Sequence, residues 1–324
     1  MEVDDRFMQR CLDLAQSAWP TCRPNPMVGA VIVKDGKIVS EGFTQAHGGP
    51  HAEVMALNGV DSGSDLSSAT IYVSLEPCAH YGKTPPCSDA IIASGLGGVV
   101  IACRDPFDSV NGKGIEKLRN AGIEVVTGVL RKEAQWQNRR FFRFHEKKRP
   151  YVVLKWAQTK DGYMDKDRNG GEALKVTAPE ASQWVHLWRA EEMGILIGGN
   201  TLRMDDPSLD VRHVHGPNPI PVIWSRNEEL RGKLAGREEV LLIRQDSVES
   251  LLDELYEKGV QSLLVEGGAH VLARFLEYGV HDEVRIWTSD FTIGSGVSAP
   301  VIDSKPDSTL QIGTDRLEFW INTP

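Results

Sequence analysis

The feature that most constrains the fold is an alternation of short apolar runs with amphipathic helical segments, which the chain goes through twice. The first series combines helices at residues 5–17, 51–57, 88–94 and 114–120 with strands at 28–33, 37–43, 70–75, 98–103 and 123–126. The second combines helices at 179–191, 248–258 and 269–279 with strands at 151–157, 194–199, 219–225, 239–244, 262–268, 284–289 and 317–322. Such alternation predicts mostly parallel sheets covered by helices on both faces.

A boundary between two α/β domains is predicted after residue 149. The 324 residues are roughly twice the length of a typical domain. Residues 130–149 are expected to form one long polar and aromatic helix that ends in basic residues before Pro150. We therefore expect domains at residues 1–149 and 150–324. We interpret the basic residues as a solvated helix end near the negative pole of its dipole, in preference to a nucleic-acid site.

Composition narrows the possible partners and the compartment. The formal net charge of −9 argues against nucleic acid or an anionic membrane as the partner. No stretch reaches the length of an apolar membrane span, and the first ten residues carry no signal sequence, so a cytoplasmic protein is expected. Five cysteines are too few and unevenly placed for a disulfide framework, so a pair of thiols is first a candidate metal site.

One histidine and two cysteines in the first half form the sharpest candidate for a metal site. His51 begins a predicted helix, while Cys78 and Cys87 follow a predicted strand and begin the next helix, so all three point toward one cleft. One imidazole and two thiolates suit tetrahedral zinc and leave a fourth position open for water, whose pKa zinc lowers to about 7. Glu53 is then a carboxylate placed to carry the proton. Alternatives are a buried pair of cysteines, or a structural zinc with His80 as fourth ligand.

The order and spacing of these residues resemble a known family. A histidine-x-glutamate followed by proline-cysteine is typical of zinc-dependent nucleobase deaminases. Eight residues separate the two cysteines here, where the ordinary cytidine deaminases have two. With the segments PNPMVG at 24–29, HAEV at 51–54 and LEPCAHYGKTPPC at 75–87, the chain resembles the bifunctional deaminase/reductase family of riboflavin biosynthesis. The resemblance implies an α/β protein whose N-terminal domain is a cytidine-deaminase-like three-layer α/β/α sandwich.

The resemblance also assigns roles in the first domain. It implies zinc-dependent deamination of a diaminopyrimidinone ribosylamine phosphate, with zinc on His51, Cys78 and Cys87 and proton transfer by Glu53. Contacts to this phosphorylated pyrimidine are implied for Asn25, His80 and Lys83. Two positions depart from the family: Thr44 stands where a histidine is usual, and Phe107 where an asparagine is usual. Both departures concern contacts to the ring and not the zinc chemistry.

The second half offers weaker signals from its residues alone. Glycine pairs follow two predicted strands, at 198–199 and 267–268. Such pairs let a phosphate approach a helix N-terminus, although an ordinary tight turn explains them equally well. The standard dinucleotide fingerprint is absent from the sequence. Pattern alone therefore does not identify the ligand of this half.

The family resemblance extends over the second half, through segments such as LKWA at 154–157, DDPSL at 205–209 and VEGG at 265–268. It implies a dihydrofolate-reductase-like α/β domain that uses NADPH to reduce the ribosyl group to ribityl. The implied cofactor contacts are Ala157, Thr201, Asp205, Ser225, Gly268, Ala269, His270, Val271, Leu272, Ala273 and Arg274. The implied substrate contacts are Arg189, Leu209, Arg212 and Glu266, with the two arginines gripping the phosphate through bidentate bonds.

Lys155 and Glu266 are expected to flank the reacting sugar carbon. In a third departure, Ala173 and Lys175 stand where the family has the serine and the tryptophan of a serine-x-tryptophan segment. This leaves open a deaminase whose second domain only binds or oligomerises. A deaminase acting on a base in nucleic acid is disfavoured by the net charge and by the long segment between the cysteines. The resemblance also implies a homo-oligomer.

Overall fold

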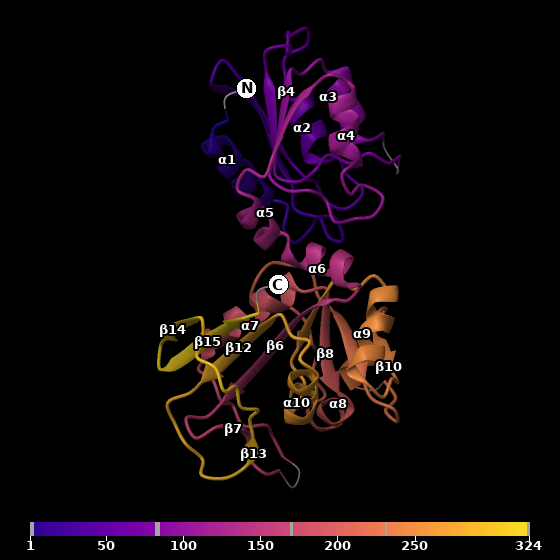
Figure 1. The fold of residues 1–324 in the computed structure, drawn as a ribbon. Coiled ribbons are helices and arrows are strands. Elements are labelled where there is room, and N and C mark those ends of the chain that lie inside the picture. The colour runs from indigo at the N-terminus through magenta and orange to yellow at the C-terminus, as the bar shows by residue number, and fades with distance from the viewer. Residues whose placement is uncertain (1–2, 82–84, 169–170, 231, 323–324) are drawn as a thin grey trace. The chain divides into compact units, whose positions relative to one another are not determined.

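The computed structural model describes residues 3–81, 85–168, 171–230 and 232–322. The chain divides into two compact units, Met1–Lys147 and Lys148–Pro324 (Figure 1). Each unit has its own sheet and its own hydrophobic core. Within the described residues, none of the helices is long and apolar enough to span a bilayer.

The first unit is built on a five-stranded sheet in the order β2-β1-β3-β4-β5. Its strands are β1 (Gly29–Lys34), β2 (Lys37–Phe43), β3 (Thr70–Val73), β4 (Gly98–Ile101) and β5 (Glu124–Thr127). A hairpin joins β1 to β2: Asp35 and Gly36 both have positive φ, the turn whose twist matches that of paired strands. The sheet is mixed, because β1 pairs antiparallel with β2 and with β3, whereas the pairs β3–β4 and β4–β5 are parallel.

Helices cover both faces of this sheet, as expected for a three-layer sandwich (Figure 1). They are α1 (Asp5–Gln16), α2 (Ala52–Asn58), α3 (Cys87–Ala93), α4 (Lys113–Asn120), α5 (Arg131–Gln137) and α6 (Arg139–Lys147). The crossovers α3 and α4 lie on one face with α2, and α1 and α5 lie on the other. The Asp4 carboxylate accepts the Arg6 N–H and so caps α1.

The prediction of one long helix over 130–149 is wrong, because Asn138 interrupts it between α5 and α6. The Asn138 side chain accepts the Met27 N–H and donates to the Met27 carbonyl, both at 2.8 Å. These two bonds occupy a side chain that is almost fully buried. Because the periodicity of a sequence does not show such a distant partner, the break was not predicted.

The second unit is built on an eight-stranded sheet in the order β10-β9-β8-β11-β6-β12-β15-β14. Its strands are β6 (Tyr151–Gln158), β8 (Gly194–Gly198), β9 (Ile220–Trp224), β10 (Leu241–Ile243), β11 (Ser262–Val265), β12 (Glu283–Thr288), β14 (Ser308–Ile312) and β15 (Asp315–Ile321). Neighbours from β10 to β12 are parallel, and β15 and β14 add an antiparallel edge. The exposed edge strand β14 and the small sheet of β7 (Tyr163–Asp165) and β13 (Val297–Ser298) were not predicted.

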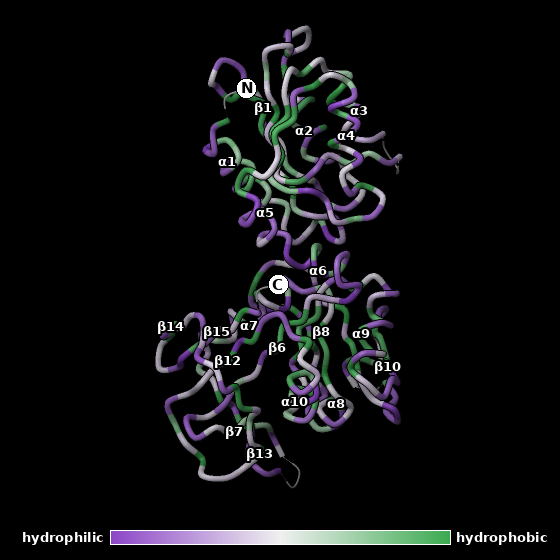
Figure 2. The backbone as a smooth tube through the Cα atoms, viewed as in Figure 1, coloured by the Kyte–Doolittle hydropathy of each residue, from purple (hydrophilic) through white to green (hydrophobic). Residues whose placement is uncertain are grey.

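Apolar clusters pack against both faces of this sheet, which explains why its central strands are continuous apolar runs in the sequence (Figure 2). The helices are α7 (Pro179–Glu191), α8 (Gly199–Asp205), α9 (Val248–Glu257) and α10 (Ala269–Tyr278), with a short 3₁₀ turn at Gly232–Leu234. Val152 and Leu154 of β6 pack in the same cluster as α9 and α10, whereas Tyr151 and Val153 pack in the cluster of α7. The alternation of side chains along a strand therefore puts Lys155 on the α7 face.

Candidate active sites

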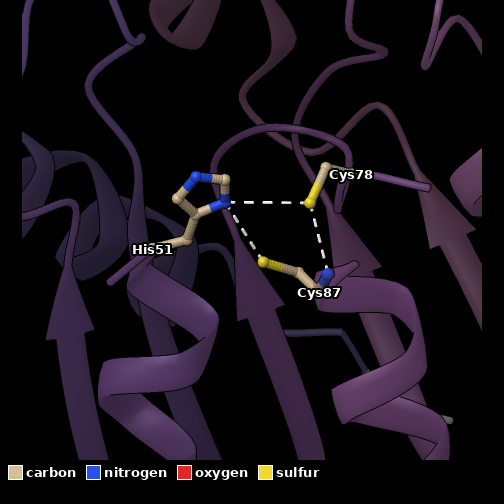
Figure 3. Close-up of side chains that lie close together, drawn as sticks. All are labelled: His51, Cys78 and Cys87. Atoms are coloured by element: carbon tan, nitrogen blue, oxygen red, sulfur yellow. Dashed lines mark hydrogen bonds between the residues drawn. The ribbon is translucent and has the colours of Figure 1, made fainter. Parts of the chain in front are cut away.

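Three predicted metal ligands converge at the ends of three elements of the first unit (Figure 3). His51 immediately precedes α2, Cys87 is the first residue of α3, and Cys78 lies in the loop after β3. The His51 Nδ1 atom lies 3.2 Å from the Cys87 Sγ atom and 3.7 Å from the Cys78 Sγ atom. The backbone N–H of Cys87 donates to the Cys78 sulfur at 3.2 Å. The two cysteines therefore lie side by side and face the histidine.

The donor set fits zinc. Its three donor atoms all lie within 4.8 Å of one another, close enough for one ion. Hydrogen bonds from Cys87 and His51 lower the pKa of the Cys78 thiol to about 4, so a thiolate forms readily. An imidazole with two sulfur ligands is a borderline-soft set, and three protein ligands are the number that catalytic zinc sites use.

Glu53 lies on the first turn of α2, two residues beyond His51, and its side chain is buried. Burial, and next the charge of Cys78, raise the pKa of its carboxyl group to about 7. Glu53 is not part of the cluster of three donor atoms. The site thus holds a carboxyl group that can exchange a proton near neutral pH beside the candidate ligands.

Glu76 organises the loop behind the cysteines, a role that the sequence reasoning missed. Its buried carboxylate accepts four backbone N–H groups, from Asp105, Gly112, Gly114 and Ile115, at 2.9 to 3.2 Å. Gly114 packs so closely that an added Cβ would lie 2.1 Å from the Pro77 carbonyl oxygen. An acidic residue directly before the proline-cysteine pair, at the end of a buried strand, was the available signal.

Two of the three predicted substrate contacts of the first unit fall in the described part of the chain. Asn25 is half-buried in the segment that leads into β1, and His80 is exposed. Lys83 lies outside the described residues. The Phe107 ring lies edge-on to the ring of His80, with 5.8 Å between centroids, so this departure from the family borders a predicted contact.

Thr44, the other departure in this unit, is buried. Its N–H donates to the Val28 carbonyl at 2.9 Å, and its hydroxyl lies 3.5 Å from the same oxygen. Thr44 therefore holds the end of the hairpin together.

In the second unit, Lys155 and Glu266 lie together with Arg189 of α7. Arg189 forms a bidentate pair with Glu266, with N···O distances of 3.2 and 2.7 Å, and the Lys155 ammonium lies 4.0 Å from the same carboxylate. Burial lowers the pKa of Lys155. Burial opposes ionisation of Glu266, yet the charges of Arg189 and Lys155 hold its pKa at about 2. The cluster is a buried carboxylate between two cations.

The two arginines predicted to grip a phosphate differ in this structure. Arg189 uses its bidentate face on Glu266 and its remaining Nη1 on the Asp210 carbonyl, at 3.2 Å. Arg212 has a side chain that is 55% exposed, and within the described part of the chain its guanidinium contacts the side chains of Ser208 and Asp210 in its own loop. Leu209 of the same loop is buried and has a φ of 50°. Of the two, Arg212 carries the guanidinium more accessible to an anion.

A cavity of about 900 Å³ lies at the carboxyl ends of the central parallel strands of the second unit. The predicted cofactor contacts that line it are Thr201, Asp205, Ser225, Gly268, Ala269, His270, Val271 and Arg274, and Glu266 lines it as well. Ala157 and Ala273 are not among its lining residues. Leu272 is fully buried in the core, because α10 turns this side chain toward the sheet, and its contact with the cofactor stays a prediction.

Close packing explains why glycines occupy the strand ends that line this cavity. A Cβ on Gly199 would lie 2.4 Å from the Ser225 hydroxyl, and one on Gly267 would lie 2.9 Å from Val271. Ala173 also lines the cavity, whereas Lys175 is exposed. Of the two positions of this departure, Ala173 is therefore the one that borders the cavity.

The fold and the buried donor set of the first unit define a deaminase of the cytidine-deaminase class, and the second unit adds a reductase. Residues 1–103 match the model of the cytidine and deoxycytidylate deaminase zinc-binding region, and residues 150–318 match the model of the RibD C-terminal domain. Riboflavin biosynthesis protein RibD of Aquifex aeolicus is 40% identical, over 92% of this chain and 90% of its own length. The protein of the same name from Synechocystis is 36% identical, over 93% and 88%.

Two solved structures superimpose on nearly the whole of this chain. The diaminohydroxyphosphoribosylaminopyrimidine deaminase/5-amino-6-(5-phosphoribosylamino)uracil reductase of Thermotoga maritima superimposes with a TM-score of 0.86 at 37% identity, covering 97% of each chain. Acinetobacter baumannii RibD superimposes with a TM-score of 0.90 at 33% identity, covering 99% of each. The chain belongs to the RibD family. It is a bifunctional enzyme of riboflavin biosynthesis, a zinc-dependent deaminase and an NADPH-dependent reductase.

Proposed function

We propose that the two halves act in sequence on one phosphorylated pyrimidine. Residues 1–149 deaminate 2,5-diamino-6-ribosylamino-4(3H)-pyrimidinone 5′-phosphate, and residues 150–324 reduce the ribosyl group of the product to ribityl. The Thermotoga maritima relative is named as a deaminase and reductase with these two activities, which supports the proposal. The observation that carries it is the convergence of His51, Cys78 and Cys87 beside the buried carboxyl group of Glu53.

In the deamination, His51, Cys78 and Cys87 hold zinc. Bound zinc supplies a Lewis acid that makes water a nucleophile at neutral pH. Glu53 carries the two protons of the attacking water, one to the ring nitrogen beside the attacked carbon and one to the leaving amine, so that the C–N bond breaks, ammonia departs and a ring carbonyl forms. Asn25, His80 and Lys83 orient the substrate. The exclusion of bulk water around Glu53 keeps the proton within the site.

In the reduction, Thr201, Asp205, Ser225 and the segment 268–271 with Arg274 hold NADPH in the large cavity. Bound NADPH supplies a hydride. Lys155 and Glu266 flank C1′ of the sugar: C1′ gains the hydride, its bond to the ring oxygen breaks, and Lys155 gives that oxygen a proton. Arg212 binds the phosphate of the substrate, and Arg189 holds the Glu266 carboxylate in place. We assign Ala157 to the cofactor and Leu209 to the substrate.

We further propose a homo-oligomer that works in the cytoplasm. The five cysteines are all free thiols, which suits a reducing compartment. Sedimentation of the purified protein gives the oligomeric state, and fractionation of cells that express it gives the compartment.

One assay tests the two-step function. The zinc-loaded protein is incubated with the diaminopyrimidinone phosphate, with and without NADPH, and ammonia release and NADPH oxidation are followed separately. We expect ammonia in both samples and stoichiometric oxidation of NADPH in the second. Ammonia release without any oxidation of NADPH would contradict the proposed reductase and favour a second domain that only binds or oligomerises.

A further inference from the structure

The loop that carries Arg212, residues 208–212, is held by side chains at each of its backbone positions. Arg237 donates to the carbonyls of Ser208 and Leu209 at 2.9 and 3.4 Å, and Arg189 donates to that of Asp210 at 3.2 Å. The Val211 N–H donates to Asn218 at 2.7 Å, and the Arg212 N–H donates to the Nδ1 atom of His186 at 3.1 Å. The backbone of this loop therefore has little freedom left, although the head group of Arg212 is exposed.

Helix α7 provides two of these contacts from one face. His186 and Arg189 are three residues apart, so their side chains lie on the same side of the helix. Arg189 also binds Glu266, so its guanidinium links the loop directly to the proposed reaction centre. His186 is buried and contacts the last position of the loop, the one that bears the exposed guanidinium.

We propose that His186 is a positioning residue of the reductase, which fixes the backbone of Arg212 and thereby aims its guanidinium at the phosphate of the substrate. The inference rests on the proposed function, in which Arg212 binds that phosphate. A guanidinium on a free loop would lose its conformational entropy at each binding event, whereas a loop fixed in advance has already lost it. The contact therefore acts on substrate affinity.

The chemistry of His186 suits this role. To accept the Arg212 N–H, Nδ1 must carry a lone pair, so the ring must be neutral. Burial, and then the positive charges of Arg189, His213 and Arg212, lower the pKa of His186 to about 4, although Glu266 opposes this. The ring of His213 stands perpendicular to that of His186, with centroids 4.5 Å apart. This contact restricts rotation of the His186 ring. The ring is thus neutral well above pH 4, and Nδ1 can then accept the Arg212 N–H.

Two substitutions separate the acceptor from the bulk of the ring. His186→Leu fills the space without an acceptor, whereas His186→Asn places its Oδ1 atom near the position of Nδ1. We expect the leucine variant to raise the KM of the reduction for the phosphorylated substrate about tenfold, the scale of one lost hydrogen bond. Its kcat and its KM for NADPH should stay within about twofold, and the asparagine variant should restore the substrate KM.

The chain offers internal controls for this experiment. Deamination by the same protein reports intact folding of the first half, and His215→Leu changes an exposed histidine of the neighbouring segment. If the leucine variant does not fold, His186→Gln replaces it, since its carbonyl lies at the position of Nε2 and should raise the same KM. An unchanged substrate KM, failure of asparagine to restore it, or an equal loss in kcat and both KM values would overturn the proposal.

Arg212→Ala distinguishes this inference from the function on which it rests. If Arg212 binds the phosphate, the alanine variant raises the substrate KM, and combining it with His186→Leu adds no further increase. A raised KM in Arg212→Ala together with a normal one in His186→Leu overturns only the role of His186. A normal KM in Arg212→Ala overturns the proposed phosphate contact, and the role of His186 with it.

Discussion

The metal ligands of the deaminase come from the stretch between residues 51 and 87, whereas the cavity of the reductase is lined by residues spread from Met164 to Val297. The first site depends on the identity of three side chains at the ends of neighbouring elements. The second depends on how several strand ends leave space between them. A set of metal ligands can therefore be recognised from a short stretch of sequence. The shape of a cavity depends on the packing of the whole sheet.

The largest effect is expected when one metal ligand of the deaminase is removed. Cys78→Ser or Cys87→Ser should abolish stoichiometric zinc binding and lower deamination by roughly 10³-fold or more, since a catalytic ion and its activated water are lost. NADPH-dependent reduction of the deaminated substrate should persist. Metal analysis and ammonia release measure the effect. Cys103→Ser is the matched control, because Cys103 is buried but its thiol bonds only to the Ser74 carbonyl; zinc retained in both ligand variants would refute the ligand set.

A single substitution in the second unit should lower reduction and leave deamination unchanged. Lys155→Met keeps the length of the chain and removes the ammonium, so we expect reduction to fall by roughly 10²- to 10⁴-fold, the contribution of a positioned acid. Deamination and zinc content should not change. Rates of NADPH oxidation and ammonia release from one preparation measure both. Normal reduction in this variant would remove Lys155 from the mechanism.

Acid should weaken the reductase half through Glu266. A carboxyl group with a folded pKa of about 2, against an ordinary 4.5, contributes stability that is fully present above about pH 4.5 and is lost as the pH falls through about 2. The difference corresponds to about 3 kcal/mol. Glu266→Gln should lower the free energy of unfolding of this half by that order at pH 7, with the gap from wild type closing toward pH 2. Denaturant unfolding at several pH values measures it, and a gap independent of pH would contradict the assignment.

The smallest effect on activity is expected from Arg274, which lines the cavity of the second unit. Its guanidinium lies over the Trp224 ring, 4.2 Å from the centroid. Arg274→Ala should raise the KM for NADPH about tenfold, the scale of one charge-assisted contact, and leave deamination unchanged. Lys258→Ala, on the exposed end of α9 and outside the cavity, is the control. Equal KM values for NADPH in the two variants would exclude a contact between Arg274 and the cofactor.

Much of the fold could be predicted because local signals and tertiary structure agree. Helix α7 begins at Pro179 and ends at Glu191, as predicted, since proline suits the first turn of a helix. The break at Asn138 depends on a partner 111 positions away, and no local pattern contains it. Helix α8 was missed because its seven residues, Gly199–Asp205, begin with the glycine that close packing against Ser225 requires.

The site was predictable where the identity of a residue carries the chemistry. His51, Cys78 and Cys87 lie together as the spacing predicted. Leu272 was assigned to the cofactor as one member of a continuous segment, yet a helix turns successive side chains about 100° apart, and Leu272 faces the core. His186 escaped notice for a different reason: it acts on a backbone N–H, and a sequence does not show which side chain meets which amide.

The paired bonds between Asn138 and Met27 bear on how this enzyme is made and how it can be divided. Met27 lies two residues beyond Asn25, in the segment that leads into β1. A ribosome that has released only the zinc-binding stretch, residues 1–103, has not yet synthesised the amide that fixes this segment. The nascent chain therefore contains all three metal ligands before it contains the amide that fixes the segment of Asn25. A deaminase domain expressed separately must extend past residue 138 to keep this segment in place.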